Sequence, residues 1–130
     1  MVSTKRLTPH LQVACLACAP AVGLGVTRFA YALLLPDMRL DLAWSFASAG
    51  WLNTSNAIGY LIGALVAASC IRRFGPRGTA TIGLAACLTS LLLCAWLREE
   101  WPLNLARLLG GSGAGLAYVA AALAATRIAS

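Results

Sequence analysis

Residues 11–35 read LQVACLACAPAVGLGVTRFAYALLL, a run in which Arg28 is the one charged side chain. About 20 apolar residues in a helix, at 1.5 Å rise per residue, cross the hydrocarbon core of a bilayer, which is about 30 Å thick. Three more apolar runs of this kind follow, at residues 46–71, 80–97 and 103–125. The sequence therefore predicts four transmembrane segments joined by short linkers.

The composition agrees with this prediction. Hydrophobic residues make up 60% of the 130 positions and charged residues only 11%, so no part of the chain resembles a soluble domain. In lipid each backbone amide must be hydrogen-bonded within the spanning structure, and the runs lack the alternation of barrel strands. We therefore predict an all-α integral membrane protein, with residues 1–130 forming a single multi-pass domain in the lipid bilayer of the cell (inner or plasma) membrane.

The distribution of basic residues predicts the orientation of these helices. Alternate linkers and the two termini carry Lys5, Arg6, Arg72, Arg73, Arg77 and Arg127. The other two linkers carry only Arg39 and Arg98, together with the acidic residues Asp37, Asp41, Glu99 and Glu100. By the positive-inside rule both termini are predicted to lie in the cytoplasm. Since no soluble module presents a clustered basic face, nucleic-acid binding is not expected.

No motif for catalysis is present in the sequence. The four predicted spans contain no Asp, Glu or His, and the chain has no phosphate-binding loop or nucleophile triad. Cys15 and Cys18 form a C-x-x-C without a second ligand pair, which is a weak metal or redox signal. We predict that the cysteines are small thiols packed between helices, and that the protein is not an enzyme and has no metal site or cofactor.

Two arginines fall inside the predicted spans, where a charge costs at least about 2.5 kcal/mol and often marks a transport pathway. Arg28 is expected about 12 Å from the outer end of its helix, and its side chain tilts inward. We predict that Arg28 lines a pathway, with a structural contact to a neighbouring helix as the alternative, and that Tyr31 shares its face. For Arg107 two interpretations stay open: a functional role, or snorkelling to the outer interface beside Glu99 or Glu100.

Polar and small residues in the second and fourth spans predict contacts between helices. Asn53 and Asn56 either hydrogen-bond to another helix or line a cavity. Gly59, Gly63 and Ala67 repeat at four-residue spacing, and a glycine-rich run that includes Gly111 and Gly115 follows in the fourth span. Small residues at this spacing let two helices approach closely, so we predict that these glycines form packing ridges.

Two groups of residues resemble the opening of the YbfB/YjiJ-type transporters of the major facilitator superfamily (MFS). The first group is Gly25, Arg28, Phe29, Tyr31, Leu34, Leu35, Pro36 and Met38. The second group is Trp44, Ser45, Gly50, Trp51, Asn53, Asn56, Gly59, Tyr60 and Gly63. Arg107, Gly111 and Gly113 are similar to the signature of the superfamily's fourth helix. The matches together cover most of residues 21–115.

The superfamily's loop signature between the second and third helices is matched in part. Arg73, Gly75 and Arg77 stand at motif positions. Ala68 replaces the first glycine, Arg72 replaces the acid, and Pro76 replaces the first of two basic residues. The missing acid leaves this chain without one partner of the gating salt bridge that the superfamily attributes to this loop.

The resemblance implies the first four helices of a twelve-helix transporter whose two halves enclose a solute near the middle of the membrane. The chain would then be a truncated part of the N-terminal half, inactive unless the missing helices or a second chain complete it. In such a transporter helices one and four line the central cavity. Arg28, Tyr31, Asn53, Asn56 and Arg107 are then the candidate cavity residues, and the two arginines would favour a small anionic solute.

Two other functions fit the length of the chain. A four-helix multidrug exporter acting as a dimer is the first, although that class places a glutamate in its first helix, where this chain has Arg28. The second is a non-transporting membrane subunit that binds another protein through its glycine ridges.

Overall fold

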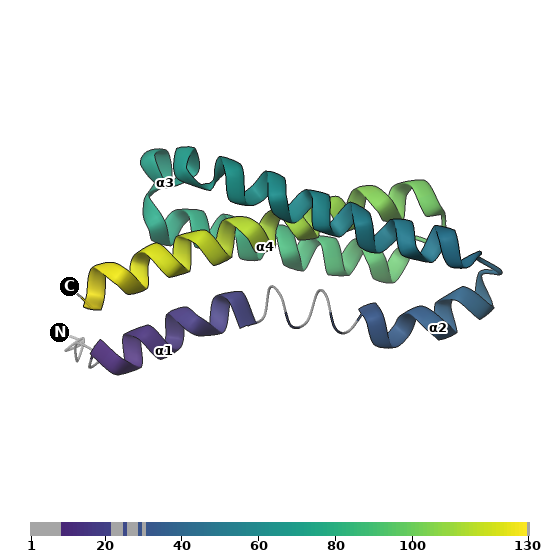
Figure 1. Ribbon diagram of the computed structural model, residues 1–130, viewed down its shortest axis with the longest axis horizontal. Helices are drawn as coiled ribbons and strands as arrows, with labels where there is room; N and C mark the ends of the chain where they lie inside the picture. The colour runs from purple at the N-terminus through teal and green to yellow at the C-terminus, as the bar shows by residue number, and fades with distance from the viewer. Residues whose placement is uncertain (1–8, 22–24, 26–28, 30, 130) are drawn as a thin grey trace.

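The computed structural model describes residues 9–21, 25, 29 and 31–129, and every regular element among them is helical (Figure 1). The elements are α1 (Pro9–Pro20), α2 (Tyr31–Asp41), α3 (Phe46–Trp96) and α4 (Glu100–Ala129). The predicted all-α class is therefore confirmed for the described part of the chain. α3 and α4 are each long and apolar enough to cross a membrane.

The first predicted span, residues 11–35, corresponds to α1, α2 and the segment between them. The prediction ended this span at Leu35, before Pro36. In the structure α2 continues through Pro36 to Asp41. α1 packs on α4, and α2 contacts α3. Arg28, the residue on which the sequence interpretation centred, lies outside the described residues.

α3 contains both the second and the third predicted span. A straight helix of its 51 residues would be about 76 Å long at 1.5 Å per residue, more than twice the thickness of the hydrocarbon core. Instead the chain reverses at Gly75, where φ is 74° and ψ is 168°. The predicted linker, residues 72–79, is otherwise helical, and the Thr79 hydroxyl donates to the Gly75 carbonyl oxygen at 2.9 Å. We call residues 46–74 the first arm and residues 76–96 the second arm.

The backbone at Gly75 predicts a specific cost of substitution. We expect Gly75→Ala to lower the free energy of unfolding by about 1–3 kcal/mol, because residues with a side chain are strained at this combination of φ and ψ. Gly50→Ala, in the regular helix of the first arm with no atom within 4 Å of the new Cβ, is the control and should be neutral or slightly stabilising. Unfolding in mixed micelles followed by circular dichroism measures both. Equal stabilities would contradict the assigned turn.

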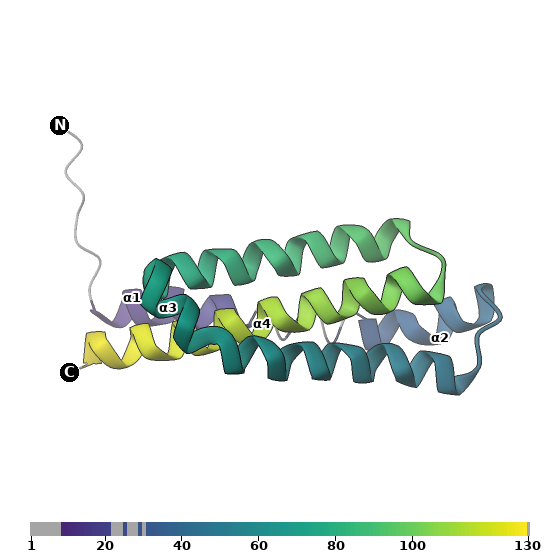
Figure 2. The ribbon, with the colours of Figure 1, turned by 90° about the horizontal axis from the view of Figure 1, so that it is seen from above.

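α4 lies between the two arms of α3, as Figure 2 shows. The backbone of α4 approaches the backbones of both arms closely. A Cβ added at Gly111 would lie 2.8 Å from the Tyr60 nitrogen of the first arm. A Cβ added at Gly113 would lie 3.0 Å from the Cys87 nitrogen of the second arm. Gly59, Gly63 and Gly115 lie equally close to backbone atoms of the facing helix.

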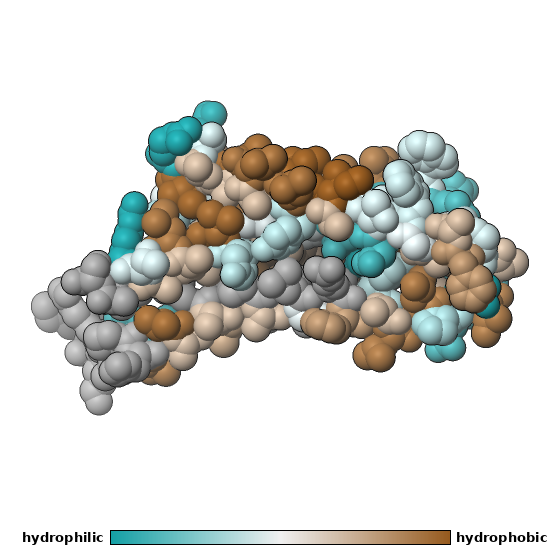
Figure 3. Space-filling view, in the orientation of Figure 1, coloured by the Kyte–Doolittle hydropathy of each residue, from teal (hydrophilic) through white to brown (hydrophobic). Residues whose placement is uncertain are grey.

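The outer surface of this helical assembly is apolar. Leu33, Leu65, Trp96 and Trp101 are each more than 70% exposed. In Figure 3 hydrophobic side chains gather over the middle of α3, and hydrophilic ones lie at the end that carries its turn. A surface of this kind suits contact with lipid tails, in which apolar side chains need no burial inside the protein.

Candidate functional site

Arg107 of α4 is the centre of the candidate site. Its side chain is 2% exposed, the largest of the fully buried side chains described. The snorkelling interpretation is therefore wrong: the guanidinium does not extend to the outer interface. Arg107 belongs to α4, which lies between the two arms of α3, and its guanidinium faces Tyr31 at the start of α2.

Tyr31, the first residue of α2, packs against Arg107. The guanidinium carbon lies 4.0 Å from the centre of the tyrosine ring, a cation–π contact, and Tyr31 is 8% exposed. Such contacts contribute about 2 kcal/mol or more when both groups are shielded from water. The Tyr31 hydroxyl has no hydrogen-bond partner among the described residues. The structure thus brings together two residues that the sequence singled out separately.

Asn56 of the first arm joins the same site through the backbone. Its side-chain nitrogen donates to the Arg107 carbonyl oxygen at 3.0 Å, and the residue is buried. Of the two interpretations left open for Asn56, the structure has the interhelical hydrogen bond. We call Tyr31, Asn56 and Arg107 the buried cluster. Asn53, in contrast, is exposed on the outside of the first arm and takes no part in it.

The second arm supplies Ser90, which the sequence interpretation missed, and Cys87, which it predicted only as a packing thiol. The Ser90 hydroxyl donates to the Ala106 carbonyl oxygen at 2.6 Å, and the Cys87 thiol lies 3.5 Å from the Gly110 carbonyl oxygen. Gly83, Cys87, Ser90 and Cys94 repeat at spacings of four, three and four residues, which places them on one helical face. This periodicity of small residues in the sequence could have predicted that this face of the second arm packs against another helix. Cys87 is buried as predicted, whereas Cys15 and Cys18 are exposed, against the prediction.

Among the described residues, grooves lie on the surface near the acidic end of the molecule. One, of about 180 Å³, is lined by Trp51, Glu100, Trp101 and Asn104. The other, of about 240 Å³, is lined by Leu34, Met38, Asp41, Leu42, Cys94, Ala95, Leu97 and Arg98. Neither groove is lined by Tyr31, Asn56 or Arg107, so neither of them opens onto the buried cluster.

The family described as "Uncharacterised MFS-type transporter YbfB" matches residues 20–130, which include every described member of the cluster. The chain belongs to this family. Comparison with curated proteins and with solved structures finds no match. As a member of an MFS family the chain is a membrane transport protein, and the resemblance drawn from the sequence is confirmed.

The MFS loop motif of this YbfB-type chain coincides with the reversal of α3. Gly75 adopts the positive φ of the turn, and Arg73 and Arg77 flank it, both exposed. The Arg73 guanidinium lies 5.5 Å from the ring centre of Phe74. Arg72, at the position of the usual acid, donates to the Ser69 hydroxyl at 3.0 Å. The motif therefore forms a cationic turn.

The hydrogen bonds between α3 and α4 contribute measurably to the stability of the protein. We expect Ser90→Ala to destabilise the protein by about 0.6 kcal/mol and at most about 1.7 kcal/mol, as found for hydrogen bonds between membrane helices. Thr89→Ala is the matched control, because the Thr89 hydroxyl donates within its own helix, to the Ala85 carbonyl oxygen, on the exposed face. Steric-trap or micelle unfolding measurements give the difference. A Thr89 effect as large as that of Ser90 would contradict this assignment.

Proposed function

We propose that this chain forms part of an MFS secondary transporter for a small anionic solute, with Arg107 as the solute's cationic partner. The observation that carries the proposal is a guanidinium that is 2% exposed inside a helical membrane transport protein. Ionisable groups at such depth belong to pathways more often than to lipid-facing surfaces. Tyr31 adds a buried hydroxyl whose hydrogen-bonding capacity no described residue uses.

Because Arg107 is buried, transport of a solute bound to it requires a movement of the helices around it. In the described conformation Tyr31 packs on the Arg107 guanidinium, and a movement of α2 away from α4 would uncover this side of it. MFS transporters alternate access by rocking one half against the other around a site near the middle of the membrane. Helices outside these 130 residues, or a second chain, complete the pathway, and Arg28 and Asn53 are the candidates to face it.

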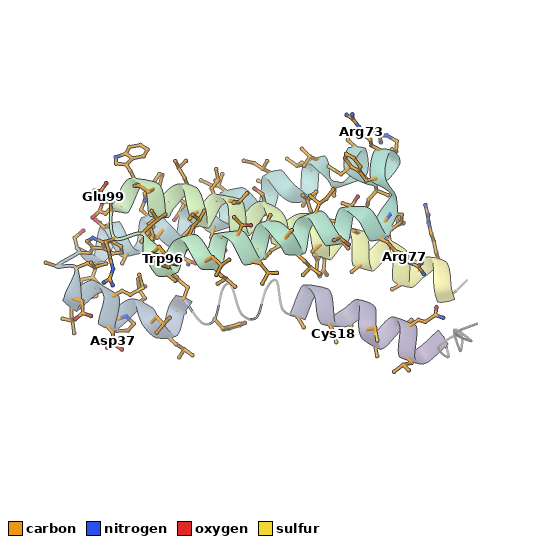
Figure 4. The ribbon with its side chains drawn as sticks, turned by 180° about the vertical axis from the view of Figure 1, so that it is seen from behind. Cys18, Asp37, Arg73, Arg77, Trp96 and Glu99 are labelled. Carbon is orange, nitrogen blue, oxygen red and sulfur yellow. The ribbon has the colours of Figure 1, made fainter. Side chains whose placement is uncertain are left out.

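We further propose four membrane-spanning segments: residues 11–35, the two arms of α3, and α4. Acidic Asp37 and Glu99 lie at one end of the molecule and basic Arg73 and Arg77 at the other (Figure 4). By the positive-inside rule the basic end faces the cytoplasm. Alkaline phosphatase fused after Glu99 should be active in the periplasm, and inactive when fused after Ser130. The reverse pattern would exclude this topology.

Uptake by proteoliposomes tests the proposed solute. The protein is expressed from its native genetic context, so that any helices encoded with it are included. We expect saturable uptake of at least one small carboxylate or phosphate ester from a labelled panel, and none of size-matched cations. Uptake of cationic dyes would favour the four-helix exporter instead. If no panel member enters faster than into empty liposomes, the proposal is wrong.

A further inference from the structure

We propose that the turn between the arms of α3 is a binding site for the headgroup of anionic phospholipids. The site, which we call the basic turn, consists of Arg72, Arg73, Phe74 and Arg77. All three arginines are exposed, and they lie within six consecutive residues. The inference rests on the charge of this surface and does not depend on the identity of the transported solute.

The basic turn has no acidic neighbour along the chain. The four acidic residues, at positions 37, 41, 99 and 100, lie in the two linkers at the opposite end of the molecule, as Asp37 and Glu99 show in Figure 4. The sequence between residues 42 and 98 contains no carboxylate at all. Ser69, the described side-chain partner of Arg72, is neutral, so it leaves the positive charge of Arg72 uncompensated.

Phe74 adds an apolar side chain to the basic turn, as is common at the boundary between the lipid tails and the headgroups of a membrane. Its ring is 52% exposed and lies beside the Arg73 guanidinium, at 5.5 Å. Gly78 allows this arrangement, since a Cβ there would lie 3.2 Å from the Phe74 Cβ. An apolar ring next to cationic groups matches the boundary between acyl chains and phosphates, where aromatic side chains concentrate. Basic residues directly beside a transmembrane helix attract anionic lipids in the same way.

The expected strength follows from the number of charges. Each arginine near an anionic membrane surface contributes about a five-fold gain in association, so three contribute about a hundred-fold. We expect the purified full chain to retain phosphatidylglycerol about a hundred-fold more strongly than Arg72→Gln/Arg73→Gln/Arg77→Gln does. Native mass spectrometry from micelles that contain equal mole fractions of phosphatidylglycerol and phosphatidylethanolamine measures this.

Two control variants make the test specific. Arg39→Gln/Arg98→Gln removes the two basic linker residues of the opposite end and should leave retention unchanged. Arg72→Lys/Arg73→Lys/Arg77→Lys keeps the charge and should also retain the lipid, while circular dichroism verifies folding of each variant.

The proposal is overturned if the glutamine variant binds as well as the parent, or if the lysine variant loses the lipid as the glutamine variant does. It is also overturned if phosphatidylethanolamine is retained equally, or if inorganic phosphate at the same concentration displaces the lipid. None of these outcomes depends on transport, so the result is separable from the solute proposal.

Discussion

Gly111→Val is expected to destabilise the protein by about 3 kcal/mol or more, which is a large part of the total stability of a typical domain. A Cβ at this position would lie 2.8 Å from the Tyr60 nitrogen and 2.9 Å from the Asn56 carbonyl carbon, and closer still to the Asn56 carbonyl oxygen. All three are backbone atoms, so no rotamer change relieves the overlap. The first arm would have to move away from α4, and the Asn56 hydrogen bond to Arg107 would break with it.

Gly50→Val is the matched control for this prediction. Gly50 lies in the first arm, and a Cβ there meets no atom within 4 Å. This variant should therefore unfold at the same denaturant fraction as the parent, because a side chain there has open space. Fluorescence-detected size exclusion after heating and unfolding in mixed micelles compare the two variants. If Gly111→Val remained as stable as Gly50→Val, the close packing of α4 on the first arm would be disproved.

Arg107→Gln is expected to reduce anion uptake by about 10- to 100-fold. A hydrogen bond to a charged group contributes about 1.5–3 kcal/mol, and each 1.4 kcal/mol corresponds to a factor of ten. Glutamine still donates hydrogen bonds but carries no charge, so the loss isolates the electrostatic part of the interaction. Arg107→Lys keeps the charge without the planar guanidinium and should give an intermediate rate. Initial rates in proteoliposomes at solute concentrations below KM measure all three proteins.

Arg39→Gln is the control for the arginine series. The Arg39 guanidinium also stacks on an aromatic ring, with its carbon 3.8 Å from the centre of the Phe46 ring, but this pair lies at the acidic end of the molecule and Phe46 is 78% exposed. Its loss should leave uptake unchanged. Circular dichroism must show that Arg107→Gln is folded before its uptake rate is compared with that of the parent. Uptake at the parental rate by a folded Arg107→Gln protein would contradict the role proposed for Arg107.

The sequence anticipated the features that depend on composition and short periodicity. Apolar runs of the length of a bilayer are helical because backbone hydrogen bonds must close within each segment. The YbfB-type resemblance rested on the order of residues along the chain, and the family comparison confirmed it. The same four-residue spacing that marked Gly59 and Gly63 appears in the structure as a line of close approach to α4.

What the sequence left open was which neighbour each helical face meets. Asn53 and Asn56 lie only about 60° apart around the first arm, yet Asn56 is buried against Arg107 and Asn53 is exposed. For Arg107 the sequence left two interpretations open, a functional role or snorkelling to the outer interface, because it considered one helix alone. The Arg107 side chain is 2% exposed, and Tyr31, more than 70 residues away in sequence, covers its guanidinium. Periodicity determines which residues share a face, and only the packing of distant segments determines whether that face meets lipid, another helix or a charge.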